Sequence, residues 1–185
     1  MLDVKNINSN WTLFLDRDGV INHDKENDYI RNWDEFRFYD AIPEAIAILS
    51  KLFGRIVVTT NQKGVGKGLM TVGDLDNIHT QMVAKINQAG GRIDKIYYCA
   101  DLADDSINRK PQPGMAFQAK HDFPEIDFSK SIIAGNRISD MGFGRNAGMH
   151  TVFMATTHPE TPYPDPLIDL RFNSLIEFAN FLTIK

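Results

Sequence analysis

The sequence predicts an α/β fold in which helices cover both faces of a parallel β-sheet, the doubly wound arrangement. Short apolar runs alternate along the chain with segments that carry apolar residues at helical spacing, as repeated βαβ units do. The apolar runs lack the polar–apolar alternation of a half-exposed strand, which indicates strands that are buried on both faces. No repeat, low-complexity tract or linker interrupts this pattern, so we expect the 185 residues to form one domain, 1–185.

In the N-terminal half, two strands and two helices are predicted. Residues 11–15 are a compact run of β-forming side chains, and residues 42–53 carry apolar side chains at helical spacing. Residues 56–60 (IVVTT) are β-branched throughout and predict the second strand. Residues 71–74 (TVGD) have the form of a capping box, which predicts a helix that begins there and ends at the glycine pair 90–91.

The C-terminal half continues the same alternation. Residues 93–99 predict a third strand, and Pro113 suits the first turn of a following helix. Residues 131–134 and 151–154 are short apolar runs that predict two more buried strands. A last helix is expected over about residues 174–182.

The charge and the cysteine content limit the range of functions that this protein can have. Lys and Arg number 20 against 24 Asp and Glu, a net charge of −4, which disfavours non-specific binding to nucleic acid or to an anionic membrane. A small phosphorylated substrate stays open, because a few local cations suffice to bind it. Cys99 is the only cysteine, which fits a reducing compartment. With no signal-peptide pattern and no apolar run of about 18 residues, we expect a cytoplasmic protein.

Polar residues follow four of the predicted strands. Ligands of open parallel sheets bind just beyond the carboxyl ends of the strands, so these residues are expected to meet at one edge. They are Asp16 and Asp18, then Thr60, Asn61 and Gln62, then Arg109 and Lys110, and finally Asn136 and Asp140.

Asp16 and Asp18 are the most informative pair. Two carboxylates one residue apart at a strand end point in different directions, so one can attack phosphorus while the other moves protons. Gly19 lets the backbone turn sharply after them. A calcium loop is the alternative, but the later oxygen ligands and the Glu of the EF-hand pattern are missing.

Four ordered motifs resemble one enzyme family. Residues 14–22 (FLDRDGVIN) resemble the first motif of the haloacid dehalogenase-like hydrolase superfamily, subfamily IIIA. A narrower group, the D-glycero-D-manno-heptose 1,7-bisphosphate phosphatases and histidinol-phosphatases, is similar in three further segments. These are residues 57–68 (VVTTNQKGVGKG), 90–99 (GGRIDKIYYC) and 109–115 (RKPQPGM). The resemblance extends from about residue 11 to residue 148 and implies a HAD-like Rossmannoid sheet; the chain leaves no room for a large cap domain.

The resemblance implies roles for the catalytic residues. Asp16 matches the nucleophile that forms an aspartyl-phosphate, and Asp18 matches the acid and base that serves the leaving oxygen and the water. For that work we expect the pKa of Asp18 to lie above the usual value of about 3.9. Thr60 matches a hydroxyl that bonds the phosphoryl group, and Lys110 matches a lysine that offsets its charge.

The resemblance also implies a metal and a substrate site. Mg²⁺ is the expected cofactor, since it prefers carboxylate and phosphate oxygens. Its expected ligands are Asp16, Asp18, Asn136 and Asp140, and the expected substrate-binding residues are Asn61, Gln62 and Arg109. The segment 23–39, with Tyr29, Trp33 and Phe36, is expected to form a specificity wall beside the site.

Two positions depart from the family pattern. Many heptose bisphosphate phosphatases carry a zinc loop with several cysteines, but no second cysteine follows Cys99, so no zinc is expected. Asn136 stands where the family usually has an aspartate. If the segment is already helical at Asn136, Asp140 lies on the same face. We expect Asp140 to supply the missing charge and Mg²⁺ to bind more weakly.

These observations predict a Mg²⁺-dependent phosphomonoesterase that acts through an aspartyl-phosphate on a small sugar phosphate. D-glycero-D-manno-heptose 1,7-bisphosphate is the first choice of substrate and histidinol phosphate the second. A phosphatase of nucleic-acid 3′ ends and a pseudophosphatase that only binds a phosphometabolite remain alternatives. The oligomeric state stays open.

Overall fold

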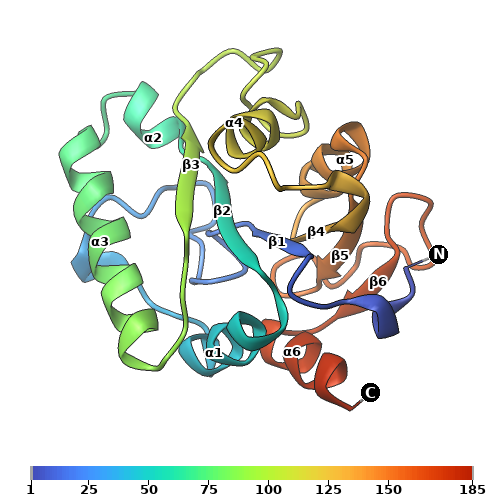
Figure 1. Ribbon diagram of the computed structural model, residues 1–185. Coiled ribbons are helices and arrows are strands. Elements are labelled where there is room, and N and C mark those ends of the chain that lie inside the picture. The colour runs from blue at the N-terminus through green and yellow to red at the C-terminus, as the bar shows by residue number, and fades with distance from the viewer. Residues whose placement is uncertain (1, 185) are drawn as a thin grey trace.

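The computed structural model describes residues 2–184 and contains one six-stranded parallel sheet with helices on both faces (Figure 1). The strand order is β3-β2-β1-β4-β5-β6. The strands are β1 (Thr12–Leu15), β2 (Arg55–Asn61), β3 (Lys95–Cys99), β4 (Ser131–Gly135), β5 (His150–Met154) and β6 (Leu170–Phe172). The predicted doubly wound sheet without a large cap domain is confirmed.

Within the described residues 2–184, six α-helices connect or flank these strands. They are α1 (Ile42–Leu52), α2 (Lys63–Gly66), α3 (Val72–Gln88), α4 (Gly114–Asp122), α5 (Ile138–Ala147) and α6 (Leu175–Thr183). Short 3-10 turns lie at η1 (Val4–Asn6), η2 (Trp33–Glu35) and η3 (Phe128–Lys130). The predicted capping box of α3 is present: Thr71 Oγ1 accepts from the Asp74 N–H at 3.1 Å, and Asp74 Oδ2 accepts from the Thr71 N–H at 2.8 Å.

The core has two layers, one on each face of the sheet. Leu13 and Leu15 of β1 pack with α1, α3 and α6, whereas Phe14 between them packs with α4 and α5. These two groups of helices cover opposite faces of the sheet (Figure 1). All four residues of β1 are buried, as expected for a strand covered on both faces. Because β1 lies between β2 and β4, residues that follow it meet the ends of both neighbours.

The sequence analysis did not predict the strand β6 or the helices α2 and α5. β6 has only three half-buried residues, and α2 has only four residues. α5 has a weak apolar periodicity because it contains close-packed glycines: a Cβ on Gly144 would lie 2.4 Å from Ile133 of β4. The glycines allow α5 to lie this close to β4. In a sequence pattern, however, glycine counts against a helix because it lowers helix stability.

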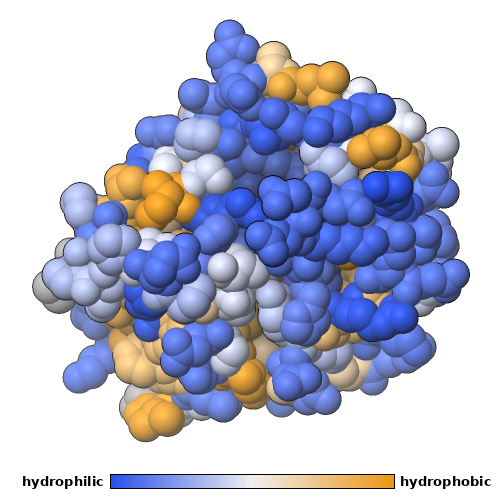
Figure 2. All heavy atoms as spheres, turned by 180° about the vertical axis from the view of Figure 1, so that it is seen from behind, coloured by the Kyte–Doolittle hydropathy of each residue, from blue (hydrophilic) through white to orange (hydrophobic). Residues whose placement is uncertain are grey.

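The surface is mainly hydrophilic. Figure 2 shows hydrophilic residues over most of the face seen from behind, with apolar side chains in separate small patches. Within residues 2–184, no helix is both long and apolar enough to cross a membrane.

Candidate active site

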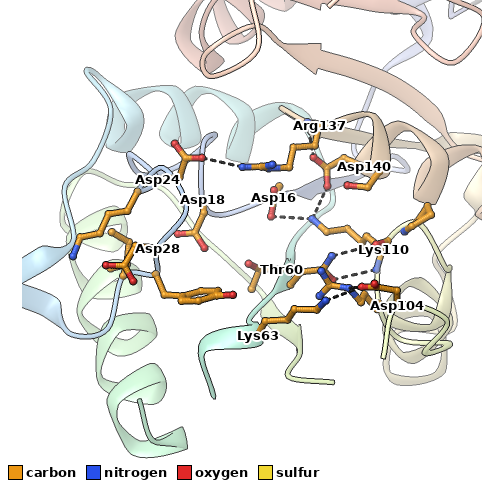
Figure 3. Close-up of a pocket in the computed structure, with 17 residues that line it drawn as sticks. Asp16, Asp18, Asp24, Asp28, Thr60, Lys63, Asp104, Lys110, Arg137 and Asp140 are labelled. Carbon is orange, nitrogen blue, oxygen red and sulfur yellow. Dashed lines mark hydrogen bonds and ion pairs between the residues drawn. The ribbon is translucent and has the colours of Figure 1, made fainter. Parts of the chain in front are cut away.

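A cavity of about 480 Å³ lies beyond the carboxyl ends of β1, β2 and β4 (Figure 3). It is lined by Asp16, Asp18, Thr60, Asn61, Arg109, Lys110 and Asp140 among the residues expected from the sequence. It is also lined by Asp24, Lys25, Asp28, Tyr29, Lys63, Asp104, Arg137 and Ser139. Residues far apart in the sequence thus converge on one edge of the sheet, as the strand-end argument predicts.

Lys110 forms the centre of the buried charge cluster. Its Nζ lies 2.9 Å from Asp16 Oδ1 and 2.7 Å from Asp140 Oδ1, and it donates to the carbonyl oxygen of Thr59 at 2.8 Å. Burial raises the pKa of Asp16 to about 7; Lys110 opposes the rise, while Asp140 and Asp18 add to it. Burial alone would lower the pKa of Lys110, but the two carboxylates raise it above its ordinary value, so the ammonium stays charged.

The carboxylate of Asp18 is held by hydrogen bonds from three side chains. Arg17 Nη2 donates to both carboxylate oxygens at 2.8 Å, and Asn22 and Gln62 donate at 2.9 and 2.8 Å. Burial raises the pKa of this carboxyl, but the charge of Arg17 and these hydrogen bonds together bring it below its ordinary value. The expectation of a raised Asp18 pKa is therefore wrong, because the sequence analysis left out the arginine between the two aspartates.

Arg17 is itself buried and has a second partner. Its side chain has no exposed surface, and its Nη1 lies 3.2 Å from Nε2 of His79 on α3. Burial and the charge of Arg17 lower the pKa of His79 to about 3, so the imidazole is neutral. Since arginine can only donate, Nε2 of His79 accepts and its proton is on Nδ1. His79 thus contacts the segment that carries Asp16 and Asp18, although it lies 62 residues from Arg17 in sequence.

Thr60, Asn61 and Gln62 follow β2 and contact their neighbours in different ways. Gln62 Nε2 donates to Thr60 Oγ1 at 2.9 Å, which leaves the Thr60 hydroxyl hydrogen to donate elsewhere. Asn61 bonds both backbone groups of Lys110, accepting from its N–H at 3.1 Å and donating to its carbonyl oxygen at 3.2 Å. Asn61 therefore positions Lys110. Gln62 is buried and does not line the cavity. Its side chain contacts Asp18 and Thr60 instead.

Two cations on the far side of the cavity share one carboxylate. Lys63 Nζ lies 2.7 Å and Arg109 Nε 3.3 Å from Oδ1 of Asp104 (Figure 3). Arg109 Nη1 is buried without a hydrogen-bond partner among the described residues. The sequence analysis predicted Arg109 but missed Lys63, which directly follows the Thr60–Gln62 segment.

The segment before η2 forms one wall of the cavity. Asp24, Lys25, Asp28, Tyr29 and Ile30 line it, and Arg137 Nη2 lies 3.2 Å from Asp24 Oδ2. In contrast to the expectation for this wall, Trp33 and Phe36 face away from the cavity. They stack on each other with ring centroids 4.9 Å apart and pack on the core.

The expected metal ligands lie in two different environments. Asp140 accepts from the Arg137 N–H at 3.0 Å and pairs with Lys110, so both carboxylate oxygens already have partners. Asn136 is fully buried, and its Oδ1 has no hydrogen-bond partner among the described residues. Because α5 begins at Ile138, Asn136 precedes the helix, and the expected shared helical face with Asp140 is wrong.

The donor set fits a magnesium ion. Three carboxyl groups, those of Asp16, Asp18 and Asp140, pair with only two cations, Arg17 and Lys110. Within residues 2–184, no group of three or more His, Cys, Asp and Glu side chains could hold a metal on its own. A cation here would need amide or carbonyl oxygens as well, and the unpartnered Oδ1 of Asn136 is one such oxygen.

Comparisons with known proteins point to one family. The family described as polynucleotide kinase 3 phosphatase matches residues 12–158. The chain is 34% identical over 170 residues to D-glycero-alpha-D-manno-heptose-1,7-bisphosphate 7-phosphatase of Mycobacterium tuberculosis, covering 91% of this chain and 90% of that protein. It is 33% identical over 174 residues to D-glycero-beta-D-manno-heptose-1,7-bisphosphate 7-phosphatase of Escherichia coli K12, covering 89% and 90%.

Solved structures agree with these sequence relatives. The D,D-heptose 1,7-bisphosphate phosphatase of B. bronchiseptica, complexed with magnesium and phosphate, superimposes with a TM-score of 0.85 at 28% identity, covering 94% of this chain and 98% of that one. The corresponding phosphatase of Burkholderia thailandensis gives a TM-score of 0.70 at 28% identity, covering 95% and 99%.

Proposed function

Because this chain belongs to the haloacid dehalogenase-like phosphatases, in the family of the heptose-1,7-bisphosphate 7-phosphatases, we propose that it removes the 7-phosphate of a D-glycero-D-manno-heptose 1,7-bisphosphate. The main observation that supports this proposal is the ion pair of Asp16 with Lys110, two residues that line the cavity. It places an oxygen nucleophile beside a fixed positive charge, and phosphoryl transfer depends mainly on such positioning and charge neutralisation.

The reaction proceeds in two displacements at phosphorus. An Asp16 oxygen attacks, the bond from phosphorus to the sugar oxygen breaks, and the leaving oxygen takes a proton from Asp18. Arg17 keeps Asp18 ionised before substrate binds, so we expect the proton to enter with the monoanionic phosphate ester, whose second pKa is about 6. Asp18 then takes a proton from water, which attacks phosphorus and releases Asp16 and inorganic phosphate.

Thr60 and Lys110 hold the transferring group. The free hydrogen of the Thr60 hydroxyl can donate to a phosphoryl oxygen, because its lone pair already accepts from Gln62. Mg²⁺ would be held by the Asp16 carboxylate, the Asp18 backbone carbonyl and Asn136 Oδ1, and it supplies positive charge that offsets the charge of the phosphate oxygens.

A second phosphate suits the opposite side of the cavity. Arg109 and Lys63 converge there, and the buried Nη1 of Arg109 has a donor to spare. The exposed carboxylate of Asp104 pairs with both cations, and a phosphate dianion can replace it with a charge-assisted contact. This pair of cations supports a bisphosphate over a monophosphate substrate.

Kinetics on a substrate panel test the proposal. Phosphate release is measured from both anomers of heptose 1,7-bisphosphate, heptose 7-phosphate, histidinol phosphate and a 3′-phosphorylated oligonucleotide. We expect the highest kcat/KM with a bisphosphate. Arg109→Gln should raise KM for the bisphosphate and leave KM for heptose 7-phosphate nearly unchanged, while the exposed Arg37→Gln serves as the matched control.

The panel also decides between the alternatives. A highest kcat/KM on the oligonucleotide would replace this proposal with a nucleic-acid end phosphatase, although Asp24, Asp28 and Asp104 around the cavity disfavour a polyanion. Release from no substrate at any Mg²⁺ concentration would indicate a pseudophosphatase.

A further inference from the structure

Asp104 is the shared partner of two cations that line the cavity. Its Oδ1 lies 2.7 Å from Lys63 Nζ and 3.3 Å from Arg109 Nε, and Figure 3 shows Lys63 and Asp104 pointing toward one another. The side chains of the two cations are only 23% and 19% exposed, whereas that of Asp104 is 87% exposed. An ion pair with an exposed partner is weak because water and salt screen it, so the carboxylate can leave the cations at little cost.

The loop that carries Asp104 is tied down on both sides of it. Before Asp104, a Cβ on Gly66 of α2 would lie 2.0 Å from the carbonyl oxygen of Ala100, so the loop packs directly on that helix. After it, the N–H of Arg109 donates to the carbonyl oxygen of Ser106 at 3.0 Å. A carboxylate on such a short tether has a high effective concentration at the two cations, even after a ligand has displaced it.

We propose that Asp104 is an internal competitor for the second phosphate of the substrate. In the free protein its carboxylate pairs with Lys63 and Arg109. A phosphate ester, whose second pKa is about 6, carries mostly two negative charges at neutral pH and displaces the singly charged carboxylate. A hydroxyl or a carboxylate on the ligand lacks the charge to do so, which makes Asp104 a specificity-determining residue. This inference rests on the position of the second phosphate in the proposed function.

The same competition acts on the product. Removal of the 7-phosphate leaves a sugar that still carries the phosphate bound by Lys63 and Arg109. Because Asp104 remains tethered beside these cations, it competes again for them once the catalytic phosphate is gone. Asp104 therefore weakens binding of the product and favours its release.

Product inhibition tests the competition. We expect the inhibition constant of heptose 1-phosphate and the KM of heptose 1,7-bisphosphate to fall about 2- to 5-fold in Asp104→Asn and in Asp104→Ala, the range that loss of an exposed ion pair allows. KM for heptose 7-phosphate, which has no second phosphate, should stay unchanged. Asp105→Asn is the matched control, because Asp105 is exposed, carries the same charge and forms no ion pair with either cation in the described part of the chain.

Three outcomes of these measurements would overturn the proposal. If Asp104 positions the cations, Asp104→Asn, which keeps a hydrogen-bond acceptor, should bind heptose 1-phosphate like the parent, and Asp104→Ala should bind it more weakly. If the negative charge of the loop acts only at long range, Asp105→Asn should gain as much affinity as Asp104→Asn. Unchanged constants in both Asp104 variants are the third outcome.

Nitrogen-15 NMR of the Arg109 Nε–H group separates this inference from the proposed function, because it needs no turnover. The signal is identified by its absence in Arg109→Gln and is followed at pH 7 while inorganic phosphate is added without Mg²⁺. Half-saturation should require about 2- to 5-fold less phosphate in Asp104→Asn than in the parent or in Asp105→Asn. The same phosphate dependence in all three proteins would overturn the inference, whereas absence of turnover on the heptose bisphosphates would refute the proposed function alone.

Discussion

The Nζ of Lys110 lies 2.9 Å from Oδ1 of Asp16, and the two side chains are only 2% and 9% exposed. The same nitrogen pairs with Asp140, so a single ammonium group is the partner of two buried carboxylates. Charges interact strongly in such a site because little solvent screens them. Removing the ammonium would leave two like charges buried at one point.

Lys110→Met should therefore abolish turnover and destabilise the fold. Breaking a buried ion pair from one side costs about 3–5 kcal/mol, which urea denaturation at neutral pH can measure. Lys51→Met, an exposed change on α1, should stay within about 0.5 kcal/mol of the parent. A Lys110→Met protein with parental stability and turnover would show that Lys110 is needed neither for catalysis nor for the stability of the fold.

Asp18→Asn should keep the fold and slow the reaction by about 10²–10⁴-fold, the usual contribution of general acid–base catalysis. The loss should shrink for aryl phosphates with acidic leaving groups, since these need no proton from Asp18. The rate of leaving-group release in the first turnover, measured for a sugar phosphate and for p-nitrophenyl phosphate, checks this, because it does not include the later attack of water. An equal loss for both substrates would argue against Asp18 as the acid.

His79 should make the fold less stable as the pH falls below about 6.5. The folded protein keeps His79 neutral, with a pKa of about 3, beside Arg17 and Asp18, whereas the unfolded chain takes up a proton near pH 6.5. The unfolded state therefore binds more protons between these values, and the free energy of unfolding falls by up to about 1.4 kcal/mol per pH unit.

Urea denaturation between pH 7 and 5 measures this slope. His79→Gln should flatten it, while His121→Gln, which changes an exposed side chain, should leave it unchanged. Equal slopes for the parent and His79→Gln would contradict the neutral, buried state of His79.

The protein should need no zinc. Cys99 is the only cysteine in the sequence, it is buried at the end of β3, and burial raises the pKa of its thiol, which disfavours the thiolate that binds zinc. Cys99→Ser should leave the metal content, measured by mass spectrometry, and the Tm almost unchanged. One zinc per chain in the parent, lost in Cys99→Ser, would overturn this prediction.

The sequence predicts those features that depend on local pattern. The buried runs around β1, β2 and β4 and the capping box of Thr71 with Asp74 are visible because each is set by residues close in sequence. The convergence of Asp16 and Lys110 also follows, since parallel strands must bring their carboxyl ends to one edge.

Features that depend on long-range packing were not predictable. Arg17 folds back onto Asp18 and reaches His79 on α3, and this arrangement reverses the expected pKa shift of Asp18. Asp104 joins Lys63 to Arg109 only because the loop after β3 lies over α2. No spacing rule in a single sequence reports such contacts.

The nucleophile is tested most directly by trapping the covalent intermediate. The protein is mixed with heptose 1,7-bisphosphate and Mg²⁺, quenched in acid within the first turnover and treated with borohydride, which reduces an aspartyl-phosphate to homoserine. Asp18→Asn, in which water attack should be slow, is trapped in parallel. We expect peptide mass spectrometry to find homoserine at position 16 only when substrate is present, and we expect Asp16→Asn to be folded, unlabelled and inactive. Turnover by Asp16→Asn, or an active protein that shows no modification at position 16, would contradict the account.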